Sequence, residues 1–199
     1  IIKYLVKHKK VDVLVTSAGG VEEDIIKCLK PFVMGKFDVP GKMLFEHGIN
    51  RTGNIFVPND RFSLFDDFMK KFFERIYKIQ KEEGKIFCPN DLIKELGLEI
   101  NNEDSILYWA AKNNVPIFCP GIIDGALGDQ VFFFKQSHPD FILDVSKEMK
   151  DIVTLVLNSE KTGAILLGGG ISKHFTLNAN IFKEGLDFAV YINTAQEFD

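Results

Sequence analysis

Residues 11–24, VDVLVTSAGGVEED, contain the change of pattern that decides the fold. The β-branched run at 11–17 predicts a short strand buried on both faces, and the glycine pair after it predicts a loop. The acids at 22–24 are expected in the first turn of the next helix, where the helix dipole favours negative charge. Pro31 predicts the end of that helix.

The same order of strand, loop and helix recurs along the chain. The further expected strands are 115–120, 141–144, 164–167 and 188–193. Such alternation predicts an α/β, Rossmann-like fold, with a mostly parallel sheet, helices on both faces and right-handed crossovers. Residues 37–114 interrupt it with a hairpin or loop region and three helical stretches. Since no linker-like segment is present, we expect residues 1–199 to form one domain.

Composition excludes several classes of protein. A chain that is 46% hydrophobic and 26% charged can fold around a core, and we interpret the Phe-rich runs at 65–73 and 131–135 as core faces of helices. The net charge of −4 argues against nucleic acid as a partner. No apolar run reaches the roughly 18 residues of a membrane span, so no membrane partner is expected.

The three cysteines indicate the redox environment. Cys28, Cys88 and Cys119 are odd in number, lack C-x-x-C spacing and lie in or beside apolar runs. This pattern favours buried thiols in a reducing compartment and predicts no metal site. We therefore expect a cytoplasmic protein.

Ligands of open α/β sheets bind beyond the carboxyl ends of the strands, which directs attention to the loops that follow each strand. These loops contain glycine, acids or histidine, and glycine lets the backbone approach a charged ligand. No G-x-G-x-x-G fingerprint is present, and Gly-rich turns also occur without a nucleotide. These glycines therefore have two open interpretations: they bind a dinucleotide, or they form turns without a nucleotide.

The acids give a sharper signal. Glu22, Glu23, Asp124 and Asp129 are expected to converge on one rim of the sheet, where a cation such as a polyamine would offset their repulsion. Each acid alone is also explained as a helix-start or capping residue. His174, expected in the first turn of its helix, is either a ligand or general base or a structural histidine.

Several long stretches carry a resemblance to a known family. They are VDVLVTSAGGVEEDIIKCLKPF, GINRTGNIFVPN, EDSILYWAAKNNVPIFCPGIIDGALGD, LLGGGISKHFTLNANIF and FAVYINTAQEFD. In this order they resemble successive segments of deoxyhypusine synthase, with divergence mainly at 61–98. The resemblance implies an NAD-dependent transfer of the aminobutyl group of spermidine, through an imine on an enzyme lysine, to a lysine of the translation initiation factor 5A precursor. The product would be deoxyhypusine, formed in the first step of hypusine synthesis.

The resemblance also implies roles for individual residues. The residues implied to contact the cofactor are Ser17, Ala18, Gly19, Glu23, Asp124, Gly169, Thr194 and Ala195. Those implied to contact spermidine are Glu22, Asp129, His174, Asn178 and Tyr191. Ser17 stands where many members have Thr, which keeps a hydroxyl, and His174 is the implied general base.

The two ends of the sequence bear on activity. The chain starts without Met and stops at TAQEFD, whereas the resemblance implies a preceding Ser-Asn cofactor loop and a following segment with the imine-forming lysine. We expect a chain truncated at both ends and inactive alone, from a family that is typically homotetrameric. Two alternatives stay open: a homospermidine synthase-like transferase with a small diamine acceptor, and an inactive paralogue acting as a regulatory subunit.

Overall fold

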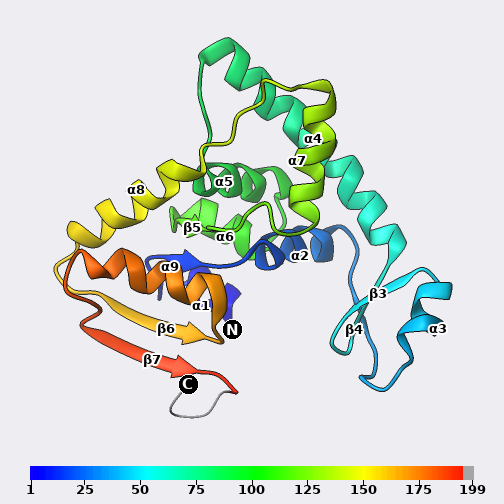
Figure 1. The fold of residues 1–199 in the computed structure, drawn as a ribbon, viewed down its shortest axis with the longest axis horizontal. Helices are drawn as coiled ribbons and strands as arrows, with labels where there is room; N and C mark the ends of the chain where they lie inside the picture. The colour runs from blue at the N-terminus through cyan, green and yellow to red at the C-terminus, as the bar shows by residue number, and fades with distance from the viewer. Residues whose placement is uncertain (195–199) are drawn as a thin grey trace.

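The first strand and helix follow the predicted order in the computed structural model, which describes residues 1–194 (Figure 1). Helix α1 (Ile2–Lys7) leads to strand β1 (Leu14–Val15) and helix α2 (Ala18–Leu29). The strand is shorter than the predicted 11–17. Helix α2 ends where Lys30 becomes extended, with φ −156°, because the ring of a following proline disfavours helical backbone at the preceding residue.

An arm follows α2 and lies apart from the rest of the molecule beside one end of α4 (Figure 1). It consists of β2 (Val33–Met34), α3 (Gly41–Glu46), β3 (Ile49–Thr52) and β4 (Ile55–Pro58). Its three strands form an antiparallel sheet in the order β2–β4–β3. The predicted hairpin is the β3–β4 pair, and the turn includes Gly53 at φ +60°, a conformation that glycine adopts at little cost.

The three predicted helices after the arm are α4 (Asn59–Glu83), α5 (Pro89–Ile100) and α6 (Ile106–Asn113). Phe65, Phe72 and Phe73 of α4 are buried, which confirms the first Phe-rich run as a core face. The second run is only partly a core face. Phe134 is buried, whereas Phe132 and Phe133 are exposed, because successive helical residues point about 100° apart.

The second half contains most of the alternating strands and helices. The elements are β5 (Ile117–Phe118), α7 (Ala126–Ser137), α8 (Val145–Leu157), β6 (Gly163–Leu167), α9 (Gly170–Ile181) and β7 (Phe188–Ile192). The predicted strand at 141–144 is wrong, since Leu143 forms only an isolated parallel bridge with Phe87. The Gln80 side chain instead binds both backbone groups of Ile142, at 3.0 and 3.1 Å, and so occupies the bonds that a strand ladder would use.

The predicted α/β class with parallel strands is confirmed, but the strands lie in two pairs. β1 pairs with β5 and β6 pairs with β7, both in parallel, and no ladder joins the pairs among residues 1–194. Helices cover both faces of β5, because Ile117 belongs to the large core and Phe118 to a second core with α8 and α9.

The β6–β7 pair is more exposed than parallel strands usually are, and it lies at the outside of the molecule (Figure 1). Every residue of β7 is exposed, as are Ile165 and Leu167 of β6. None of the helices between residues 1 and 194 has both the length and the apolar character required to cross a bilayer.

Candidate functional site

The predicted site residues follow the carboxyl ends of the parallel strands. Ser17 is the N-cap of α2 just beyond β1, and Gly169 is the N-cap of α9 just beyond β6. Asp124 lies in the loop between β5 and α7, and Thr194 follows β7. Ala195 lies outside the described residues. Because each pair is parallel, the loops of its two strands share one edge.

The two sets of loops meet beside Gly121. A Cβ added to this glycine would lie 3.3 Å from Cδ1 of Ile171 in the first turn of α9, and 3.9 Å from Cβ of Asp124. The loop after β5 is therefore packed against the start of the helix that follows β6. This close approach brings the loops of both strand pairs to one rim.

Glu22 is the acid that the structure ties most firmly to this rim. Its Oε2 accepts a hydrogen bond from the Leu127 N–H of α7 at 2.8 Å. Gly125 has φ +152°, and a Cβ there would lie 2.8 Å from both carboxylate oxygens of Glu22. The absence of a side chain at Gly125 thus allows the carboxylate to lie against the loop backbone.

The electrostatics of Glu22 connect it to Asp129. Burial raises the pKa of Glu22, and the negative charges of Glu23 and Asp129 raise it further, whereas the Leu127 hydrogen bond acts in the opposite direction. Asp129 belongs to the first turn of α7. Two carboxylates that repel each other across a loop favour a cationic ligand, whose charge would offset the repulsion.

The other two acids of α2 have different partners. Asp24 accepts hydrogen bonds from the Ser105 hydroxyl at 2.5 Å and from the N–H groups of Ile106 and Leu107 at 2.9 and 3.1 Å. It therefore caps the start of α6. Glu23, implied to contact the cofactor, forms an exposed ion pair with Lys27 at 3.2 Å.

The predicted first-turn position of these acids is wrong. Helix α2 begins at Ala18, directly after β1, so the glycine pair lies within the helix and Glu22 is one turn further along. The same correction applies to His174, because α9 begins at Gly170. The dipole at the start of α2 therefore does not account for an acid at position 22.

The residues implied to contact spermidine from α9 and β7 form a separate group. His174 and Asn178 are exposed and lie one helical turn apart. Tyr191 is also exposed, and the Nζ of Lys173 lies 5.5 Å from the centre of its ring. No described contact within residues 1–194 joins the His174 side chain to the acids around Glu22, and the two groups approach each other through the packing at Gly121.

The backbone at the start of α9 is open to a ligand. Ser17 makes no capping hydrogen bond with its side chain, although it begins α2. Gly168, Gly169 and Gly170 have open space where a Cβ would be, with nothing within 4 Å. Helix starts with accessible backbone next to parallel strands are suited to a pyrophosphate group.

Sequence reasoning missed Glu148, a buried acid of α8 that is 1% exposed. Its Oε1 accepts a hydrogen bond from the backbone N–H of Cys119 at 2.6 Å, and burial raises its pKa to about 7. The periodicity contained a signal for it. Glu148 precedes the buried Ile152 and Val156 by four and eight residues, so it occupies the core-facing stripe of its helix.

The described thiols are not activated, and no group of three or more His, Cys, Asp or Glu side chains in residues 1–194 could hold a metal ion. Burial raises the pKa of Cys88 to about 11 and that of Cys119 to about 12. Both side chains therefore remain thiols near neutral pH and are poor nucleophiles.

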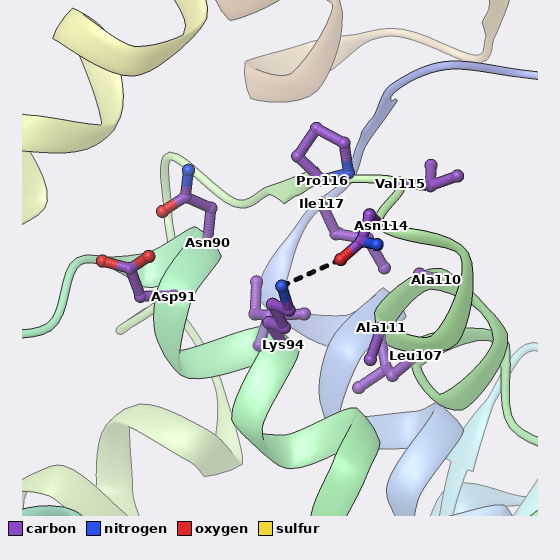
Figure 2. Close-up of a pocket in the computed structure, with 11 residues that line it drawn as sticks. Asn90, Asp91, Lys94, Leu107, Ala110, Ala111, Asn114, Val115, Pro116 and Ile117 are labelled. Atoms are coloured by element: carbon purple, nitrogen blue, oxygen red, sulfur yellow. Dashed lines mark hydrogen bonds between the residues drawn. The ribbon is translucent and has the colours of Figure 1, made fainter.

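A cavity of about 130 Å³ lies at the other end of β5, between α5 and α6 (Figure 2). Its polar wall includes Asp91 and Lys94, and the Nζ of Lys94 donates to Oδ1 of Asn114 at 3.0 Å. None of the predicted site residues lines this cavity. It is also smaller than the roughly 300 Å³ at which small-molecule sites begin, so it does not compete with the rim as the main site.

Comparison with known proteins identifies the family to which the chain is similar. The sequence model of the family described as deoxyhypusine synthase matches residues 1–199. The chain is 51% identical to a protein of Methanocaldococcus jannaschii named probable deoxyhypusine synthase and covers 63% of it. It is 49% identical to the deoxyhypusine synthase of Senecio vernalis and covers 54% of it, and both alignments include 100% of this chain.

A solved structure is similar to this chain in fold and carries the same family name. The crystal structure of a proposed deoxyhypusine synthase from Entamoeba histolytica matches 98% of this chain and 60% of its own, with a TM-score of 0.74 and 35% identity. The chain thus spans about half to two thirds of the length of these relatives. Because the family model matches every residue, this chain belongs to the deoxyhypusine synthase family.

Proposed function

We propose that the complete protein transfers the aminobutyl group of spermidine to a lysine of the translation initiation factor 5A precursor, in an NAD-dependent reaction. The observation that carries the proposal is the match of all 199 residues to the family, including the strand-end loops that form the rim. The geometry of the acids supports spermidine as the substrate, because their mutual repulsion favours a cation.

Glu22 and Asp129 would bind the ammonium groups of spermidine. A carboxylate that accepts a hydrogen bond from an ammonium forms one of the stronger polar contacts in proteins. His174, Asn178 and Tyr191 would contact the other part of the substrate from α9 and β7. A neutral imidazole at His174 would accept a proton from the amine as it is oxidised.

The dinucleotide would lie over the starts of α2 and α9. Ser17 and Gly19 would face it from the first helix, where the side chain of Ala18 is buried and only its backbone could take part. Gly169 would face it from the second helix, and Asp124, Glu23 and Thr194 from the surrounding loops and helix. When bound, NAD supplies a hydride acceptor. The open backbone at Gly168–Gly170 is the feature of this chain that accommodates such a group.

We further propose a homotetramer in the cytoplasm. Apolar side chains are exposed on β6 and β7, among them Phe188 and Val190. Their exposure supports the proposal that this surface is covered in the complete protein. The free state of Cys28, Cys88 and Cys119 agrees with a reducing compartment. No lysine of this chain matches the family's nucleophile, so we propose that residues 1–199 alone are inactive.

A transfer assay tests the proposal directly. The complete protein would be incubated with spermidine labelled in the aminobutyl group, with NAD, and with either the factor 5A precursor or a small diamine. We expect label in the precursor, and only when NAD is present. Label that enters the diamine alone would replace the proposal with a homospermidine synthase-like activity, and the absence of all transfer would support a regulatory paralogue.

A further inference from the structure

The backbone N–H of Cys119 marks the point where β5 becomes the loop of the rim. On one side of the strand, the Phe118 carbonyl accepts a hydrogen bond from the Thr16 N–H at 2.9 Å. The next N–H, that of Cys119, is held instead by Glu148 of α8 at 2.6 Å. The β1–β5 ladder therefore ends at an N–H group whose hydrogen bond is accepted by one buried carboxylate.

We propose that Glu148 is a positioning residue, which holds the start of the loop from Cys119 to Gly125 and thereby sets where Asp124 and Gly125 lie. The loop contacts Glu22 through Gly125 and approaches α9 through Gly121, so displacement at its first residue would move both sides of the rim. The inference rests on the proposed function, because it assigns the rim to ligand binding.

The charges around Glu148 are few. Asp151 lies one turn further along α8, and its charge is compensated by Lys147 at 2.7 Å. Lys147 also reaches Asp91 of α5 at 3.4 Å. From α9, the neighbouring core contains apolar side chains such as Phe175 and Ala179, and from α2 the charge of Glu22 acts on Cys119.

Ionisation of Glu148 would change the strength of this contact. A hydrogen bond from an N–H to a charged carboxylate is roughly twice as strong as one to a neutral oxygen. Burial raises the pKa of Glu148 to about 7, so the side chain exchanges its proton near neutral pH. The loop would accordingly be held more tightly above pH 7 and less tightly below it.

Glu148→Gln tests this inference, because glutamine keeps the shape and an acceptor oxygen but has no charge. We expect the affinity of the variant for NAD to equal, at every pH, the affinity of the wild type at pH 6. Calorimetric titration of the complete protein with NAD should show wild-type affinity falling about five-fold from pH 8 to pH 6, which is the fold-change expected from one weakened charged hydrogen bond. That step should be absent in Glu148→Gln and present in Glu82→Gln, which removes an exposed acid of α4.

Hydrogen exchange provides a readout that does not depend on ligand binding. After correction for the intrinsic rate, the protection of the peptide covering 119–125 should decrease in the wild type between pH 8 and pH 6. In Glu148→Gln it should stay at the lower, pH 6 level throughout. Protection of this peptide that does not change with pH in the wild type would overturn the inference, even if the variant fails to fold. Failure of the wild type to bind NAD at any pH would instead overturn the proposed function. The exchange result alone would then test whether Glu148 holds the loop.

Discussion

At the residue scale, three carboxylates that are buried or half-buried accept hydrogen bonds from backbone groups rather than from basic side chains. Glu22 accepts from an N–H of α7, Glu148 accepts from an N–H after β5, and Asp24 accepts from N–H groups of α6. Of the three, only Glu22 has its charge directed to the rim, where Asp129 also acts on it. The charge of Glu22 thus remains available to a cationic ligand, because within residues 1–194 no lysine or arginine is among its described hydrogen-bond partners.

Asp129→Ala in the complete protein should weaken spermidine binding far more than NAD binding, because the lost charge would face an ammonium group. A hydrogen bond to a charged group contributes roughly 1.5 to 3 kcal/mol, so the dissociation constant for spermidine should rise about ten-fold or more. Calorimetric titrations with each ligand would measure this, with Asp129→Asn as the isosteric control. Equal weakening of the two ligands would show that Asp129 does not discriminate between them.

Gly125→Ala should disturb the same site by a different cause. A Cβ would overlap the Glu22 carboxylate, and alanine adopts φ +152° only with strain. We expect about a ten-fold loss of spermidine affinity as the carboxylate is displaced. Gly41→Ala is the matched control, since a Cβ at that helix start meets nothing within 4 Å. Unchanged spermidine affinity in Gly125→Ala would argue against the assigned position of Glu22.

Glu148 should make the stability of the protein depend on pH. Its pKa is about 7 in the fold and 4.5 ordinarily, so between these values the folded state binds the extra proton. Stability through this group is therefore complete below pH 4.5 and is lost as the pH rises through 7, by about 3 kcal/mol. Urea unfolding at several pH values should show this loss in the wild type relative to Glu148→Gln. A constant difference between the two proteins from pH 5 to pH 8 would contradict the assigned pKa.

At the element scale, the sequence patterns predicted most helices and strands because their hydrophobic periods are strong. The failures have local physical causes. Residues 141–144 are apolar enough for a strand, but Gln80 takes the backbone groups of Ile142. The start of α2 was misplaced because glycine was interpreted as a loop residue, although Gly20 lies in the first turn of the helix. Glu148 was missed because a single charged residue in an apolar stripe was not treated as buried.

The cap that Asp24 provides for α6 should be important for stability, since α6 packs against both α1 and α5. Asp24→Ala removes the acceptor of three hydrogen bonds and leaves the N–H groups of Ile106 and Leu107 without this acceptor, while the Ser105 hydroxyl still accepts from the Tyr108 N–H. We expect a loss of about 2 to 3 kcal/mol in the free energy of unfolding, measured by urea denaturation. Asp24→Asn should lose less, and Asp67→Ala, at an exposed position of α4, should change little. A value for Asp24→Ala equal to that for Asp67→Ala would exclude the capping role.

At the scale of the whole molecule, the parallel pairing of strands was predictable from the alternation of strands and helices, but the division into two separate pairs was not. Periodicity indicates that a strand exists and does not indicate its neighbour. The second core, which includes Phe118 and Ala179, packs the β1–β5 pair against α8 and α9, and no shared ladder joins the two pairs among residues 1–194. The relative positions of His174 and Glu22 depend on that packing.

Residues 1–199 alone should transfer no aminobutyl group to the acceptor protein, even with NAD and spermidine in excess. Capture of the group requires a lysine that is neutral near pH 7, which needs a desolvated or charge-tuned environment. Lys173 is the lysine at the rim, and its Nζ lies over the ring of Tyr191. Incubation with labelled spermidine would test this, with Lys173→Ala as the comparison. Label in the acceptor that disappears in that variant would place the nucleophile within this chain.

The exposed β6–β7 pair has a practical consequence for such assays. Parallel strands are normally covered on both faces, and uncovered strand edges pair readily with other chains. The alternation of Ile165, Leu167, Phe188 and Val190 on an open two-stranded ribbon therefore makes the isolated chain prone to aggregation. An inactive preparation would carry information only if light scattering shows that it is monodisperse, and a low protein concentration would favour that state.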